Sequence, residues 1–82
     1  MRFINYATYV EDQQKLADLR PQHASYLTSL LAEGKLAAAG SFADGTGELQ
    51  VYETDSAETA RAVAAADPLA AGGGVADSEL KP

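Results

Sequence analysis

The chain has no cysteine and no tryptophan, and its 82 residues include one histidine. Without cysteine it forms neither a disulfide framework nor a thiolate site, which excludes a stapled secreted scaffold and a zinc ribbon. Positive charge is also scarce, because six lysine and arginine residues face twelve aspartate and glutamate residues, a formal net charge of -6. This balance argues against nucleic acid as a partner, since phosphate-backbone binding depends on clustered basic side chains.

Long apolar runs are missing as well. The apolar stretch within residues 1–6 is too short for a signal peptide, and no segment approaches membrane-spanning length. We therefore expect a soluble, cytoplasmic protein with no membrane partner. The length predicts a single domain over residues 1–82, close to the size at which one core stabilises a chain only marginally.

Four segments have the composition and alternation of strands. They cover residues 2–10, 35–42, 47–54 and 75–80, and the turn-rich residues 43–46 make the middle two a hairpin. Both faces of the first strand carry apolar or aromatic groups. That pattern is typical of a central strand that is covered on both sides.

Apolar positions at helical spacing predict a principal helix within residues 12–33, followed by Gly34 as its C-terminal cap. Proline disfavours a helix interior but suits a first turn. We therefore expect a short turn over residues 11–19 and the main helix from about Pro21.

A second helix is predicted from the run Asp55-Ser56-Ala57-Glu58, which has the form of a capping box, to about Ala66. Residues 69–74 read as a glycine-rich connection. The resulting order predicts an α+β, ferredoxin-like βαββαβ fold with a four-stranded antiparallel sheet and both helices on one face. So short a chain cannot cover the other face, so we expect a homodimer that forms through the sheet.

His23 is the first candidate for chemistry, because an unperturbed histidine titrates near neutral pH. Near a helix N-terminus the positive end of the dipole favours the neutral imidazole, which can act as a general base. A lone histidine is nonetheless more often a packing residue, here beside Tyr26 and Leu27. Asp67 is the candidate carboxylate that orients the base, although an Asp-Pro turn needs no function.

Three further residues are candidates for substrate binding. Arg20, one helical turn before the histidine, either holds a substrate carboxylate or enolate or pairs with Asp18 or Glu11 at the surface. Tyr6 either lines the pocket or packs under the helices, and Ser41 either points into the cavity or ends its strand. One histidine with scattered carboxylates makes a poor metal site, and we expect neither a metal nor a cofactor.

Short runs occur in a fixed order along nearly the whole chain. They are Arg20-Pro21-Gln22-His23, Glu33-Gly34-Lys35-Leu36, Ala39-Gly40, Asp55-Ser56-Ala57-Glu58-Thr59-Ala60 and Ala66-Asp67-Pro68-Leu69. Together they resemble the YCII-related (YciI-like) family. The resemblance implies a ferredoxin-like subunit, a dimer related to the dimeric α+β barrel proteins, and an active site centred on a histidine and an aspartate, which carry over as His23 and Asp67.

The chemistry associated with that family is lyase-like, and muconolactone isomerases share the wider fold. The resemblance therefore implies a small cofactor-independent lyase or isomerase that moves a proton on a small organic metabolite. Two alternatives stay open: a non-catalytic dimeric protein that binds a small molecule or supports a larger enzyme, and an oxygenase-like member of the same superfamily. The chain departs from the family at Leu69, usually aromatic, and at the glycines of residues 72–74, so the resemblance does not name a substrate.

Overall fold

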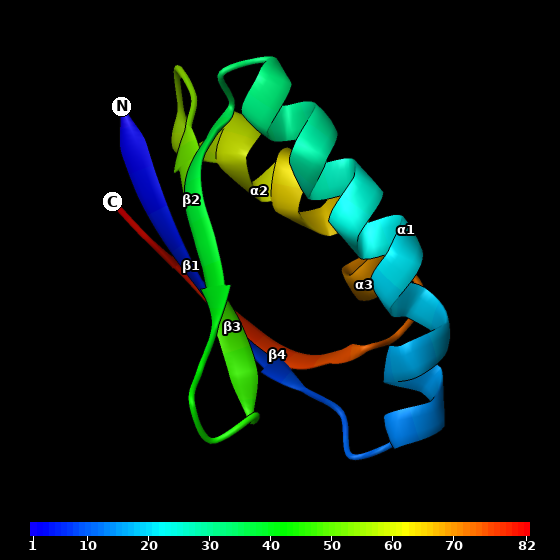
Figure 1. The fold of residues 1–82 in the computed structure, drawn as a ribbon. Helices are drawn as coiled ribbons and strands as arrows, with labels where there is room; N and C mark the ends of the chain where they lie inside the picture. The colour runs from blue at the N-terminus through cyan, green and yellow to red at the C-terminus, as the bar shows by residue number, and fades with distance from the viewer.

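In the computed structural model, which describes residues 1–82, a four-stranded antiparallel sheet carries three helices on one face (Figure 1). The strands are β1 (Arg2–Tyr9), β2 (Leu36–Ser41), β3 (Gly47–Glu53) and β4 (Val75–Lys81). The helices are α1 (Gln13–Ala32), α2 (Ala57–Ala66) and α3 (Pro68–Ala71). The sheet order β2-β3-β1-β4 confirms the predicted ferredoxin-like α+β fold.

The four predicted strands are confirmed to within one residue at each end. β1 lies in the interior of the sheet, hydrogen-bonded to β3 on one side and to β4 on the other. β1 therefore has the central position in the sheet that its alternation pattern predicts.

None of the helices combines the length and the apolar character needed to cross a membrane.

The principal helix is continuous, and the predicted break before Pro21 is wrong. α1 begins after Asp12, whose side chain caps the first turn, and Pro21 lies in its interior. Proline removes one backbone hydrogen bond there, but Leu16 and Leu30 bury their side chains on either side of it and hold the helix against the sheet. His23 consequently lies in the middle of a helix and not in a first turn.

The second helix begins one residue later than its predicted capping box, because Ser56 and not Asp55 is the cap. The Ser56 hydroxyl accepts a hydrogen bond of 3.1 Å from the backbone N–H of Thr59. At the other end Asp67 terminates α2 and caps α3, since its Oδ1 accepts from the backbone N–H of Leu69 at 2.9 Å. The predicted connection over residues 69–74 is therefore partly helical.

The two faces of the sheet differ in the polarity of the side chains that they carry. Facing the helices, β1 and β3 pair Phe3 with Tyr52, Asn5 with Gln50 and Ala7 with Glu48. Facing away, they pair Ile4 with Val51 and Tyr6 with Leu49. The helix-facing side thus holds an apolar core at one end, formed by Phe3, Leu30, Leu36, Tyr52 and Ala60, and buried polar side chains at the other.

The outer face, meaning the side of the sheet away from the helices, has no helix over it (Figure 1), and it is apolar at the centre of β1 and β3 but charged along β4. Tyr6 is 44% exposed there, and its ring centroid lies 6.4 Å from that of Phe42. Ile4, Leu49 and Val51 share this face. Within one chain nothing covers these side chains, and the predicted homodimer stays a prediction.

Gly47, where β3 begins, provides a test of the sheet register. A Cβ at this position would collide with the Ala7 carbonyl oxygen on β1, whereas a Cβ at Gly40 on β2 would meet nothing within 4 Å. We expect Gly47→Ala to lower the free energy of unfolding by about 1–3 kcal/mol. Gly40→Ala is the matched control, with an effect of about 0.5 kcal/mol or less. Urea denaturation measures both, and equal midpoints for the two variants would contradict the register.

Candidate active site

His23 and Asp67 meet in the buried polar half of the chain. α1 presents the imidazole toward the sheet, and the junction of α2 and α3 presents the carboxylate. Nδ1 of His23 lies 2.7 Å from each Asp67 oxygen, and the two side chains are 11% and 5% exposed. The structure therefore brings together the two residues that the sequence selects as a catalytic pair, whose catalytic role stays a prediction.

The other ring nitrogen is held by Glu48, which the sequence analysis missed. Nε2 of His23 lies 2.9 Å from both Glu48 oxygens, and the Glu48 side chain is 4% exposed. Asp67, His23 and Glu48 are called the triad below. The imidazole separates the two carboxylates, which leaves them on opposite sides of the ring, and no group of three or more metal-ligating side chains is arranged to hold an ion.

The partners of His23 favour its charged form, the imidazolium, over the neutral base that the sequence predicts. Burial by itself lowers its pKa, but the hydrogen bonds and charges of Asp67 and Glu48 outweigh burial and raise the pKa to about 9. The predicted dipole effect is absent because the residue lies mid-helix. Both ring nitrogens therefore donate, Nδ1–H to Asp67 and Nε2–H to Glu48.

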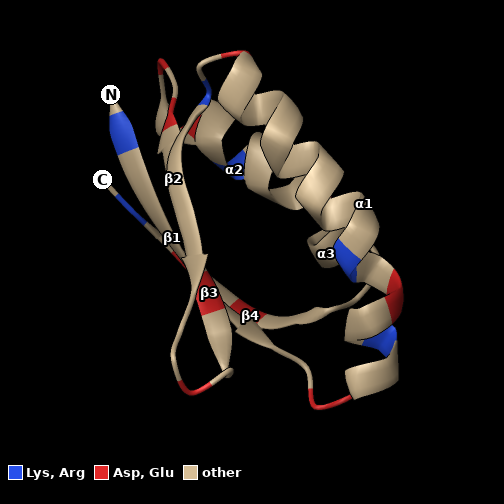
Figure 2. Cartoon of the chain, viewed as in Figure 1, with Lys and Arg blue, Asp and Glu red and all other residues tan.

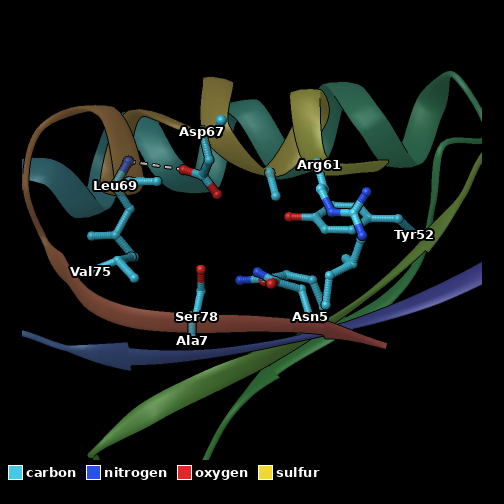
Figure 3. A pocket seen from close by; sticks show the side chains of 13 residues that line it. Asn5, Ala7, Tyr52, Arg61, Asp67, Leu69, Val75 and Ser78 are labelled. Atoms are coloured by element: carbon cyan, nitrogen blue, oxygen red, sulfur yellow. Dashed lines mark hydrogen bonds between the residues drawn. The ribbon is translucent and has the colours of Figure 1, made fainter. Parts of the chain in front are cut away.

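A cavity of about 260 Å³ lies between the sheet and the α2–α3 junction (Figure 3). Asp67 points into it from the helix layer, and Asn5 and Ser78 point into it from the sheet (Figure 3). Most of the remaining wall is apolar, and buried Leu69 forms part of it. His23 is not among the lining residues, so Asp67 is the member of the triad that faces the cavity.

Several polar atoms of the cavity wall have no partner within the chain. Tyr52 is 1% exposed, and its hydroxyl, which points toward the cavity centre in Figure 3, makes no hydrogen bond. Asn5 donates to Gln50 over 2.8 Å, which leaves one amide oxygen and one amide nitrogen of this pair free. Burial, then the charge of Asp67, raises the pKa of Tyr52, so its hydroxyl stays protonated and available as a donor.

Arg61 is the cation at this cavity, a second residue that the sequence analysis did not select. It extends from α2 beside Tyr52 and forms no ion pair (Figure 3). Basic residues are few elsewhere, and acidic ones are scattered over loops, strands and helices (Figure 2). Arg61 is therefore placed to attract the negative charge of a ligand in the cavity.

The three predicted substrate-binding residues lie outside this cavity. Arg20 neither lines it nor pairs with Asp18 or Glu11, and its charge acts instead on Tyr9. Tyr6 is on the outer face, where it neither lines this cavity nor packs under the helices. Ser41, exposed at the end of β2, lies close enough to the Tyr9 hydroxyl to lower its pKa, although burial raises that pKa overall.

The glycine run after α3 is packed against the helices. A Cβ at Gly72 would meet Leu19 and the Pro68 carbonyl oxygen, and a Cβ at Gly74 would meet Leu69. The departure from the resembled family at these positions therefore lets the chain pass close to α1 and α3 beside the cavity wall.

A family model described as YCII-related domain matches residues 1–82 of the chain. The uncharacterized protein YjpA of Bacillus subtilis (strain 168) is 45% identical over 51 residues, which are 62% of this chain and 60% of that protein. The match thus spans less than two thirds of either sequence.

Two solved structures share the fold. One is TftG, 5-chloro-2-hydroxyhydroquinone dehydrochlorinase from Burkholderia phenoliruptrix AC1100, in complex with 2,5-dihydroxybenzoquinone; it has a TM-score of 0.86 and 23% identity, covering 100% of this chain and 92% of that one. The other is a muconolactone isomerase, with a TM-score of 0.78 and 21% identity, covering 99% of this chain and 85% of that one. At these identities the likeness shows a common fold.

The raised pKa of His23 makes the stability of the protein depend on pH. Because the folded state holds this proton more tightly than the unfolded state, the stabilisation is complete below pH 6.5 and is lost as pH rises through about 9. We expect the free energy of unfolding to fall across this window by at most about 1.4 kcal/mol per pH unit. Denaturation of wild type and His23→Gln at several pH values measures it. The same slope in both proteins would contradict the assignment.

Proposed function

Since the chain belongs to the YCII-related family, we propose that it is a small cofactor-independent enzyme of the lyase or isomerase type, which transfers a proton on a small organic ligand through Asp67 and His23. The observation that carries this proposal is the position of Asp67. Its buried carboxylate faces a cavity, and on the side away from the cavity it pairs with the imidazole ring of His23. A carboxylate so placed is within reach of a ligand proton, which is the first requirement of a general base.

The geometry favours Asp67 as the base and His23 as its partner, the reverse of the roles predicted from the sequence. Each ring nitrogen of His23 is already bonded to a carboxylate, and the ring is charged, so it has no lone pair for a ligand proton. Asp67 Oδ1 accepts from Leu69, which leaves Oδ2 the freer oxygen to receive the proton.

The reaction that this arrangement supports begins with loss of a proton from an acidic carbon or hydroxyl of the ligand to Asp67. The electron pair of the broken bond then forms a double bond within the ligand. In a lyase a leaving group departs with its own electron pair, and in an isomerase the proton returns at another carbon. Neither course needs an oxidant or a reductant.

The cavity also limits the ligand. Its volume and apolar wall suit a small compound of about one ring, and the free hydroxyl of Tyr52 and the Asn5–Gln50 pair suit oxygen substituents on it. Arg61 favours a carboxylate or an enolate. The dehydrochlorinase whose fold this chain shares was solved with 2,5-dihydroxybenzoquinone, a compound of this size and chemistry, which makes it a suitable probe.

The direct test is turnover of 5-chloro-2-hydroxyhydroquinone, followed by chloride release, and of muconolactone, followed by isomerisation. We expect Asp67→Asn and His23→Gln to lower the rate by roughly 10²- to 10⁴-fold, because each removes half of the proton-transfer pair. Asp18→Asn, the same change at an exposed position of α1 outside the cavity, is the matched control and leaves the rate unchanged.

Full activity of Asp67→Asn would contradict the proposal. The non-catalytic alternative predicts a different pattern: 2,5-dihydroxybenzoquinone raises the melting temperature, yet no compound is turned over. Oxygen consumption with a phenolic substrate would indicate the oxygenase-like alternative instead.

The proposed enzyme is a homodimer that forms through the outer face. In a single chain this face leaves Ile4, Leu49 and Val51 only partly buried, although the helix-facing side of the same strands buries Gln50 and Glu48. Exposed apolar patches of this kind tend to mark interaction surfaces, and a second copy of the chain offers the same apolar surface in a two-fold arrangement.

Val51→Lys tests the dimer, because a charge at the centre of an apolar interface is costly to bury. We expect light scattering coupled to size exclusion to give the mass of two chains for wild type and of one chain for the variant. Ala62→Lys, at an exposed position of α2, is the control and stays dimeric. A dimeric Val51→Lys protein would exclude this face as the interface.

A further inference from the structure

Glu48 has a carboxylate that the proposed reaction does not use. It projects from β3 to the side of the imidazole opposite Asp67, and it is not among the cavity-lining residues. Glu48 is therefore not placed to meet a ligand in the cavity directly. Any effect of Glu48 on the reaction must therefore pass through His23.

The charge of the triad changes when Asp67 takes a proton. Before transfer the imidazole ring lies between two carboxyl groups, Asp67 at Nδ1 and Glu48 at Nε2. After transfer Asp67 is a neutral acid, and the imidazolium needs another counter-ion because an unpaired buried charge is strongly unfavourable. Glu48, whose two oxygens lie 2.9 Å from Nε2, is then the one carboxyl group left beside the ring that can serve as this counter-ion.

We propose that Glu48 is a positioning residue whose charge keeps His23 an imidazolium after Asp67 has accepted the ligand proton. This inference rests on the proposed function and deepens it. A histidine paired with Asp67 alone would lose its counter-ion at the moment of transfer. With Glu48 present, Nε2–H stays bonded throughout, and the proton moves only at the cavity side of the ring.

Tyr9 holds Glu48 in this position. The Tyr9 hydroxyl, from β1, donates to Glu48 Oε1 over 3.3 Å, while both Glu48 oxygens lie 2.9 Å from His23 Nε2. The carboxylate is thus bonded from β1 and from α1, and it cannot turn away without breaking a hydrogen bond.

No other charge near the triad replaces Glu48. Tyr9, Tyr26 and Tyr52 surround the carboxylates from β1, α1 and β3, and the pKa of each is raised, first by burial, so each stays neutral. Arg20 on α1 and Arg61 on α2 form no ion pair with either carboxylate. β2 has no titratable side chain, and those of β4 pair in register with outer-face residues of β1. Asp67 and Glu48 are the charged groups that act on the pKa of His23.

The test needs no substrate, because Asp67→Asn mimics the state in which Asp67 carries a proton. ¹⁵N NMR of the one histidine follows its protonation directly. In Asp67→Asn we expect His23 to remain an imidazolium at neutral pH, with a pKa still above its ordinary 6.5. In Glu48→Gln the pKa should fall by about 1 unit or more from its wild-type value.

In the double variant, Asp67→Asn with Glu48→Gln, only burial remains, and the pKa should fall below 6.5. Glu58→Gln, the same change at an exposed position of α2, is the matched control and leaves the histidine unchanged. Glu48→Asp keeps the charge, so the pKa of His23 in this variant should lie closer to the wild-type value than in Glu48→Gln. The comparison separates the effect of charge from that of packing.

Two results would overturn the inference: a neutral imidazole in Asp67→Asn at pH 7, or a wild-type pKa in Glu48→Gln. If the double variant does not fold, the two single variants decide the question. The proposed function fails by a different result, undiminished turnover in Asp67→Asn, which is independent of what the spectra of the Glu48 variants show.

Discussion

The structure depends on one buried cation held by two carboxylates. His23 comes from α1, Glu48 from β3 and Asp67 from the junction of α2 and α3, so the triad ties the helix layer to the sheet at its polar end. Burial opposes the charge on the imidazole, and the two partners overcome it. Asp67 is fixed further by its bond from the Leu69 backbone, and Glu48 by its bond from Tyr9. Local capping and tertiary ion pairing thus hold the same side chains.

This constraint explains why the sheet places its polar residues inside and its apolar residues outside. The helix-facing side of β1 and β3 must supply Glu48 to the imidazolium and the Asn5–Gln50 pair to the cavity. Period-two alternation then sends Ile4, Leu49 and Val51 to the opposite side. In the proposed dimer that surface is covered by a second chain. The same strand register therefore places the polar residues of the triad and cavity on the helix-facing side and the apolar residues of the proposed dimer interface on the outer face.

The sequence predicted the fold well because the strands, the turn signals and the order of elements are local properties of the chain. It also selected His23 and Asp67, through a resemblance in motifs, and the structure places them in contact. It missed Glu48 because a strand that alternates Glu, Leu, Gln and Val usually turns its polar side to solvent. The sequence did not predict a continuous α1, because burial on both sides of Pro21 outweighs one lost hydrogen bond. It therefore placed His23 at a helix N-terminus and predicted the wrong direction for the shift of its pKa. Arg61 and Tyr52 meet only in the folded chain, where no spacing rule connects them.

The protonation state of His23 in the wild-type protein tests this account most directly. The chain has one histidine, so a ¹⁵N spectrum of the imidazole near pH 7 needs no assignment between residues. The account predicts protons on both ring nitrogens and their retention until the pH approaches about 9. A bare ring nitrogen at pH 7, with titration near the ordinary value of 6.5, would contradict the central claim that two carboxylates hold a buried imidazolium.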